Sequence, residues 1–288
     1  MTEHHDRLPY DAVDISSLTF WASSQEERDL RFAELRRRDP VSWQRPVDSA
    51  IATPEIPGFW AVTTNELIRE VSTHPELFCS GEGTQLEEIP DDFRTAAESF
   101  LGMDGEEHHA DDLASMFVSM SFAGNDTTRT TISLGTKTFL DHPDQLAYLM
   151  ADFDGRIDAA VEEVLRWVTP IMTFRRTATR DTVLGGKQIR AGDWVVMYYA
   201  SGNRDDNAFD NPWTFDITRR PNGHVAFGGG GPRFCLGSFL AKMMLRHMFG
   251  ELFHRVPALT LGTPDLLVGN FACAVKRLPV STTCPVAR

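Results

Sequence analysis

The sequence has few cysteines, and they are widely spaced. Its 288 residues include four, at Cys79, Cys235, Cys273 and Cys284, and no two of these form a CxxC motif. This spacing argues against a structural zinc site, and four cysteines in a chain of this length do not make a disulfide scaffold. We therefore expect a protein of the reducing cytoplasm.

The chain also lacks a long apolar run and an excess of positive charge. No segment approaches the ~20 apolar residues of a transmembrane helix, and the polar residues 1–11 contain no signal-peptide core. The chain has 28 Lys and Arg against 41 Asp and Glu, a formal charge of −13. Nucleic acids and anionic membranes repel such a chain, so we expect neither as a partner. A hydrophobic content of 42% is enough for a sizeable core.

Hydrophobic periodicity predicts a helix-rich α+β protein. The predicted helices cover residues 26–38, 65–72, 111–140, 143–153, 158–168 and 236–255. The predicted strands cover residues 41–43, 58–63 and 194–200, with a hairpin over 183–189. We expect irregular structure over residues 1–24, 79–110 and 201–231.

The segment Phe227–Gly237 carries a single cysteine, Cys235, between a run of four glycines and a predicted helix. The first amides of that helix would favour the thiolate over the thiol, and the glycines would let the backbone approach a flat partner. A thiolate presented in this way suits the iron of a haem. The alternatives are a phosphate-binding loop, which would end in Gly-Lys-Ser/Thr, and a buried inert cysteine, which would not explain the glycines.

A polar cluster, Ala123–Thr128, interrupts the longest predicted helix. Gly costs about 1 kcal/mol in a helix interior, and Asp and Thr compete there for backbone hydrogen bonds. Such local conflicts tend to mark functional sites. The glycine would allow a local widening of the helix that makes a groove for a small ligand, and an acid beside an alcohol can relay protons. Taken alone, the cluster fits a solvated polar patch equally well.

Glu163 and Arg166 stand three residues apart on a predicted helix, where their charges can pair. Alone, such a pair indicates little. Together with the polar cluster before it and the cysteine loop after it, however, it resembles the motif order and spacing of cytochrome P450 haem-thiolate monooxygenases. Further segments similar to this family are Phe174–Ala178, Ala200–Asp205 and His224–Phe227. The resemblance is nearly continuous over residues 111–288 and weaker over 14–80.

The resemblance implies a mainly α (α+β) cytochrome P450 fold with a long central helix that crosses the haem. Residues 1–104 would form an N-terminal β-rich region with short helices, and residues 105–288 a haem-binding helical region, the two making one domain. In the family a block of helices lies between these parts, and here residues 103–111 are nearly all that joins them. The fold therefore looks truncated. Losing that block would expose the flank of the long helix, including Phe117 and Met120.

The resemblance also implies roles for individual residues. Cys235 would be the proximal iron ligand of heme b (iron protoporphyrin IX). Asp126 and Thr127 would deliver protons during oxygen activation, and Gly124 would leave room for the oxygen. Glu163 and Arg166 would form a buried structural pair. The remaining cofactor-binding residues would be the propionate partners Arg176, His224 and Arg233, with Phe227, Gly229 and Gly237 in the cysteine loop.

Three local departures from the family pattern accompany these roles. The loop has one extra residue between Phe227 and Cys235, a variation known in a bacterial branch that acts on lipids. Arg233 stands where bacterial members often have His, and it keeps the positive charge. Thr214 stands where many members have an Arg that joins the Glu–Arg pair, which puts the usual triad in doubt.

For function, the resemblance implies insertion of one oxygen atom of O2 into a C–H bond of an apolar substrate. The loop variant and Phe20-Trp21 are similar to an actinobacterial branch that hydroxylates methyl-branched lipid or sterol side chains. Residues 219–255 hold six Lys and Arg against one acid, so we expect an acidic ferredoxin as electron donor, unless the clustering is accidental. The alternative hypothesis is a catalytically silent, truncated member with weak or no haem binding.

Overall fold

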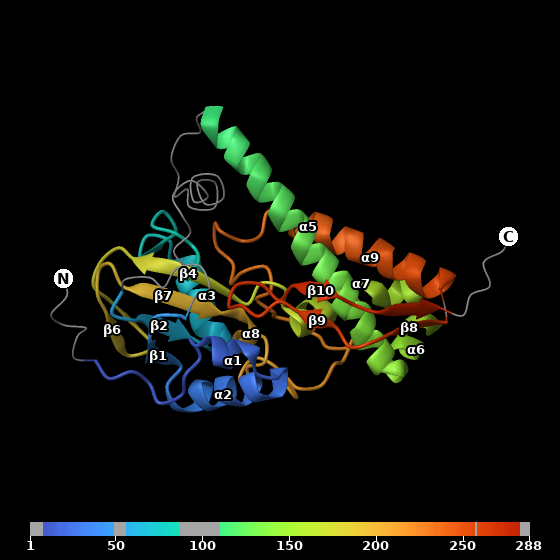
Figure 1. The fold of residues 1–288 in the computed structure, drawn as a ribbon, viewed down its shortest axis with the longest axis horizontal. Helices are drawn as coiled ribbons and strands as arrows, with labels where there is room; N and C mark the ends of the chain where they lie inside the picture. The colour runs from blue at the N-terminus through green and yellow to red at the C-terminus, as the bar shows by residue number, and fades with distance from the viewer. Residues whose placement is uncertain (1–7, 49–55, 87–109, 257, 283–288) are drawn as a thin grey trace.

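The computed structural model describes residues 8–48, 56–86, 110–256 and 258–282, and places a β-sheet region beside a layer of helices (Figure 1). The helices are α1 Leu18–Ala22, α2 Gln25–Arg38, α3 Asn65–Thr73, α5 Ala110–Asp141, α6 Pro143–Ala151, α7 Phe153–Val168, α8 Tyr199–Gly202 and α9 Ser238–Arg255. The strands are β1 Val41–Gln44, β2 Phe59–Val62, β3 Phe78–Cys79, β4 Thr173–Ala178, β5 Thr182–Leu184, β6 Lys187–Ile189, β7 Trp194–Tyr198, β8 Leu259–Leu261, β9 Asp265–Leu266, β10 Val275–Arg277 and β11 Val280–Thr282.

The predicted helices and the predicted hairpin are confirmed. The differences between prediction and structure lie at short elements and at the start of α7. Residues 1–24 were expected to be irregular, but α1 forms there because the Ser17 side chain caps it, accepting from the Phe20 amide at 3.1 Å. The helix predicted from residue 158 begins at Phe153, where Asp152 accepts from the Gly155 amide. The segment 87–109, most of the predicted loop 79–110, lies outside the described residues.

The main sheet has the strand order β1-β2-β7-β4-β3. Strand β2 runs antiparallel to β1 and parallel to β7, with Ala61 opposite Val196. Strands from the first 80 residues therefore pair with strands from beyond residue 170. This shared sheet supports the proposal that the two regions form one domain; their expected boundary at residue 104 lies outside the described residues.

Alternate residues of the central strand β7 pack on opposite faces of this sheet. Val195 and Met197 belong to the core that includes α3. Val196 and Tyr198 belong to a second core, built with α1 and α2. The first of these cores fixes the position of α3, which the cysteine loop contacts.

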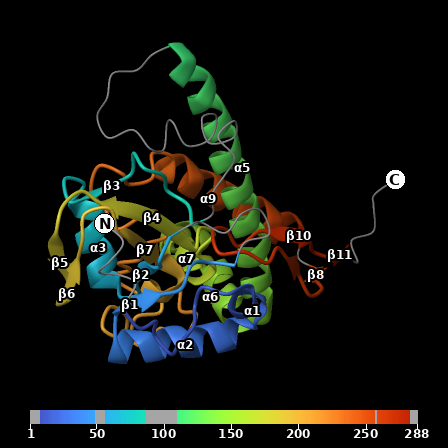
Figure 2. The same ribbon diagram turned by 60° about the vertical axis from the view of Figure 1, so that its left-hand side comes forward.

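A third core joins the helices α5, α6, α7 and α9. Its centre is Phe139 of α5, which is fully buried. The Phe139 ring meets the rings of Phe215, Phe249 and Phe253 edge-on, at centroid distances of 5.3, 5.7 and 5.3 Å. These contacts hold the C-terminal half of α5 against α9 (Figure 2).

The N-terminal half of α5 projects beyond the other helices (Figure 1). Phe117 is 74% exposed, and Met120 and Phe122 are also exposed, as expected for Phe117 and Met120. The helix is α-helical throughout, so the predicted local widening at Gly124 is absent. No described helix is long and apolar enough to cross a bilayer.

The substitution Phe139→Ala is expected to lower the free energy of unfolding by about 3–5 kcal/mol, because it leaves a cavity among three aromatic rings. Phe117→Ala, about six turns away on the exposed half of the same helix, is the control and is expected to change stability by less than about 0.5 kcal/mol. Denaturant unfolding measures both. Similar losses for the two variants would contradict this assignment of the core.

Candidate functional site

The cysteine loop closes on itself through the backbone. The Cys235 amide donates to the Phe227 carbonyl at 2.9 Å. Gly228 and Gly230 have φ angles of +95° and +100°, a region that side chains disfavour. These two glycines therefore allow the tight course of the loop.

Another two glycines of the loop are required by α3. A Cβ on Gly229 would lie 2.6 Å from Ser72 Oγ, and one on Gly231 would lie 2.3 Å from the Ser72 carbonyl oxygen. The close approach that these glycines serve is therefore to α3, within the protein. Packing against α3 fixes the loop independently of any bound partner.

The sulfur of Cys235 lies at the start of α9, in an exposed residue. Desolvation by the atoms around the sulfur raises the pKa of the thiol, and the Gly237 amide opposes this by donating a hydrogen bond to it. Burial outweighs the amide, so the predicted preference for thiolate does not follow from the helix start alone. A metal ion bound to the sulfur in place of the proton would supply positive charge and so favour the thiolate.

The surroundings of Cys235 fit a haem. Large exposed apolar side chains flank it in the chain, and they are Phe234, Leu236, Phe239, Leu240 and Met243. A flat apolar group would cover such a surface. In the described part of the chain no cluster of three His, Cys, Asp or Glu could hold a metal. Haem iron, which brings its own porphyrin ligands, needs only one such sulfur from the loop.

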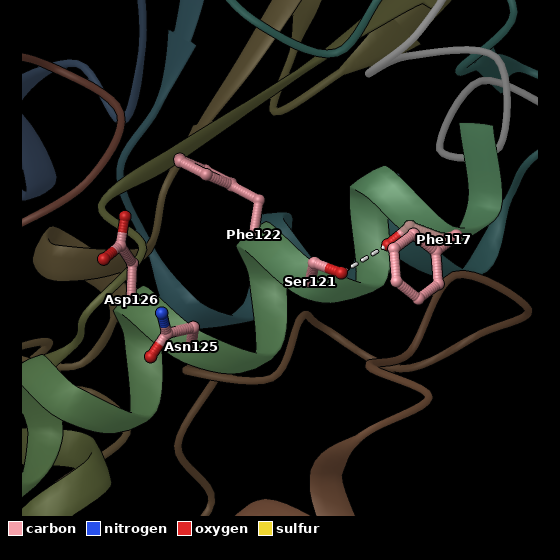
Figure 3. Close-up of a pocket in the computed structure, with 5 residues that line it drawn as sticks. All are labelled: Phe117, Ser121, Phe122, Asn125 and Asp126. Atoms are coloured by element: carbon pink, nitrogen blue, oxygen red, sulfur yellow. Dashed lines mark hydrogen bonds between the residues drawn. The ribbon is translucent and has the colours of Figure 1, made fainter. Parts of the chain in front are cut away.

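The polar cluster of α5 faces an open hollow lined by Phe117, Ser121, Phe122, Asn125 and Asp126 (Figure 3). The Asp126 carboxylate accepts from Arg129 at 2.9 Å. The Thr127 hydroxyl donates to the Ala123 carbonyl at 2.7 Å, which leaves its oxygen able to accept. A Cβ on Gly124 would meet no described atom within 4 Å. The acid, the alcohol and the open space thus lie together on one helix that packs against α9.

Glu163 and Arg166 form a bidentate ion pair on α7, and neither side chain is exposed. Arg166 Nε donates to Oε2 at 2.8 Å and Nη2 to Oε1 at 2.7 Å. The remaining Nη1 donates to the carbonyls of Asn203 and Pro212, at 2.8 and 2.9 Å. The pair therefore holds the segment that follows α8.

A second cation reaches this pair from a residue that the sequence analysis missed. Arg219 Nε donates to Glu163 Oε2 at 3.3 Å. Thr214 takes part only through its carbonyl, which accepts from Arg166 at 3.1 Å and from Arg219 at 3.2 Å. The triad of one glutamate and two arginines is thus complete. Its second arginine is Arg219 and does not come from position 214. The local pattern Asp-Ile-Thr-Arg, after a turn, could have suggested it.

The three expected propionate partners have different surroundings. Arg176 is buried on β4, and its Nη1 donates to the Arg175 carbonyl at 2.8 Å. Arg233 is half-buried in the cysteine loop. His224 points elsewhere: its Nε2 lies 2.9 Å from Glu162 Oε2, and its Nδ1 accepts from the Ala226 amide at 3.2 Å. In this arrangement both of its ring nitrogens are hydrogen-bonded within the protein.

Comparison with known proteins agrees with this geometry. The family model for cytochrome P450 matches residues 87–258. This chain belongs to the cytochrome P450 family. A Mycobacterium marinum cytochrome P450 solved in complex with pseudoionone superposes with a TM-score of 0.91 and 35% identity, covering 95% of this chain and 99% of that one.

Two curated relatives carry names of activities. A methyl-branched lipid omega-hydroxylase of Mycobacterium tuberculosis is 42% identical over 180 residues, covering 62% of this chain and 42% of the relative. A steroid C26-monooxygenase of Rhodococcus jostii is 40% identical over 190 residues, covering 64% and 40%. The chain thus spans about two fifths of the length of these relatives.

Arg219→Ala is expected to lower the free energy of unfolding by about 1–3 kcal/mol, because buried Glu163 loses a donor. The control is Thr214→Ala, which keeps the backbone carbonyl through which Thr214 takes part in the triad. It is expected to lower the free energy of unfolding by less than about 0.5 kcal/mol. Urea unfolding of both variants tests this. A larger loss for the threonine variant would mean that the triad position is occupied by the side chain of Thr214.

Proposed function

We propose that this chain is a haem-thiolate monooxygenase that inserts one atom of O2 into a C–H bond of an apolar substrate. The observation that carries the proposal is the position of Cys235, an exposed residue flanked by apolar side chains. Cys235 lies at the start of α9, and α9 packs against α5, the helix that carries Asp126 and Thr127. Membership of the cytochrome P450 family supports it.

The bound cofactor would be heme b, which supplies the activation of O2. Cys235 Sγ would hold the iron, and the Gly237 amide would temper the charge on that sulfur. Arg176 and Arg233 would bind the propionates. Phe227 would pack beside the ligand, since its carbonyl already holds the Cys235 amide.

On the opposite side, residues of α5 would move protons. The partly exposed Asp126 would exchange protons with solvent and pass them to the Thr127 hydroxyl, whose position the Ala123 carbonyl fixes. Gly124 would leave room for O2, because a side chain there would occupy the open space beside α5.

The substrate class we propose is an apolar chain, such as a methyl-branched lipid or a sterol side chain. The names of the two curated relatives support this class. Phe117 and Phe122 give the hollow on α5 an apolar lining. Position relative to the iron, rather than polar recognition, would then choose the carbon that reacts.

We further propose a ferredoxin as electron donor, in the cytoplasm. The described cysteines Cys235 and Cys273 are free thiols, as expected in a reducing compartment. The basic segment is partly neutralised by the protein itself: carboxylates pair with Arg219, Lys242, Arg246 and Arg255. Attraction to an acidic donor would therefore be weaker than the count of charges indicates.

The rate of the first electron transfer from a small acidic ferredoxin is expected to fall about two- to fivefold between low and high salt, because ions screen the attraction between the proteins. Stopped-flow reduction under carbon monoxide measures this rate. A rate that does not fall with salt would overturn the ferredoxin proposal.

A second candidate function is supported by two observations. The chain spans about two fifths of its curated relatives, and Phe117, Met120 and Phe122 are exposed on α5. An open distal side would admit water and release reduced oxygen without product. The alternative is therefore a catalytically silent member that binds haem weakly or not at all.

Spectroscopy separates the two functions. Purified chain is mixed with haem, reduced and exposed to carbon monoxide, and the monooxygenase is expected to show the red-shifted Soret band of thiolate-ligated iron. Cys235→His should abolish the band, whereas the control Cys273→Ser should keep it. Absence of haem binding by the parent chain would support the silent member, and persistence of the band in Cys235→His would overturn the ligand assignment.

A further inference from the structure

One carboxylate on α7, that of Glu162, contacts two segments that flank the cysteine. Its Oε2 lies 2.9 Å from His224 Nε2. Its Oε1 lies 2.6 Å from Lys242 Nζ on α9. Residues 224 and 242 enclose the whole cysteine loop and the first turn of α9. Glu162 therefore ties both ends of the segment that carries Cys235 to the same point of α7.

The hydrogen-bond partners of His224 define one tautomer of its neutral ring. Nδ1 accepts from the Ala226 amide at 3.2 Å, so this nitrogen carries the lone pair. The proton of the neutral ring is then on Nε2, which donates to Glu162. The His224 side chain is only 5% exposed, so loss of the acceptor would leave a buried donor without a partner.

Both partners of Glu162 contact the residue that holds the cysteine amide. The His224 ring lies 5.9 Å from the Phe227 ring, centroid to centroid. The Lys242 ammonium lies 5.4 Å from the centroid of the same ring. The Phe227 carbonyl in turn accepts from the Cys235 amide at 2.9 Å. A continuous set of contacts thus runs from Glu162 to the backbone of Cys235.

The two arms of this contact set differ in burial. The Glu162–Lys242 ion pair is 31% and 37% exposed, and pairs in such surroundings contribute little. The histidine arm is buried. Burial raises the pKa of Glu162, but hydrogen bonds from His224 and Lys242 more than offset this, and the pKa lies below its ordinary value. The histidine bond is therefore the arm that fixes the loop.

We propose that Glu162 is a positioning residue for the Cys235 ligand, acting through His224 and Phe227 to fix the sulfur at the start of α9. The part that concerns iron rests on the proposed function, whereas the effect on the loop does not. No step of the oxygen chemistry is assigned to Glu162, which reaches the ligand only through these two residues.

The chain contains a matched control one turn away on the same pair of helices. Asp158 of α7 pairs with Arg246 of α9 at 3.0 Å, just as Glu162 pairs with Lys242. Among the described residues Asp158 forms no hydrogen bond or ion pair with the loop, so its removal weakens only the link between the helices. A comparison of the two positions isolates the histidine arm.

Hydrogen exchange of the full chain without haem tests the effect on the loop. Glu162→Ala is expected to speed exchange of the Cys235 amide and its neighbours about tenfold, because the loop opens locally more often. Asp158→Ala should leave this rate within about twofold. Glu162→Gln should restore slow exchange, since its amide oxygen still accepts from His224 Nε2. An unchanged rate in Glu162→Ala, or equal acceleration in Asp158→Ala, would overturn the proposal.

The haem-loaded chain provides the second measurement. At equal bound haem, the reduced carbon monoxide complex of Glu162→Ala should contain a smaller fraction of thiolate-ligated iron than the parent, and Glu162→Gln should recover it. An unchanged fraction would overturn the claim about the ligand. If the parent itself binds no haem, the proposed function fails, and hydrogen exchange alone decides whether Glu162 fixes the loop.

Discussion

The buried charges of Glu163 and Arg166 determine the course of the chain between the sheet and the cysteine. Each would be costly alone in an interior with no water, so their mutual bonds have to be complete. The remaining guanidinium hydrogens of Arg166 bond to backbone carbonyls after α8. The carboxylate of Glu163 also accepts from Asp216, Arg219 and Asn222. The segment that leads to the cysteine is therefore shaped around a pair on α7, with no regular secondary structure of its own.

Local pattern predicted the long helices well, because each has apolar residues at helical spacing, and α5, α7 and α9 bury part of them in one core. It predicted the site less well. Thr214 was compared with a family position, whereas the second cation comes from Arg219. His224 was predicted as a propionate partner, and its contact with Glu162 was not foreseen. In both cases the deciding partner lies more than fifty residues away in sequence, and no local periodicity reports such a contact.

The glycines of the cysteine loop also show that a local sequence pattern does not identify a distant contact. Their number indicated a close approach to a flat ligand, and the structure shows that Gly229 and Gly231 serve an approach to Ser72 of α3. The two explanations are compatible, because a loop pressed against α3 from one side can present its sulfur on the other. Sequence alone could identify the need for glycine, but not the partner that creates it.

The two sides of the candidate site are supported to different degrees. On the side of Cys235, α3, α7 and α9 fix the loop through packing and paired charges. On the side of Asp126, the supporting helix is held in the helical core through its C-terminal half, whereas Phe117 and Phe122 of its N-terminal half lie exposed. Holding an iron depends on the first side, whereas keeping water away from activated oxygen depends on the second. Ligand binding and productive turnover are therefore separable properties of this chain, since the residues that secure one do not secure the other.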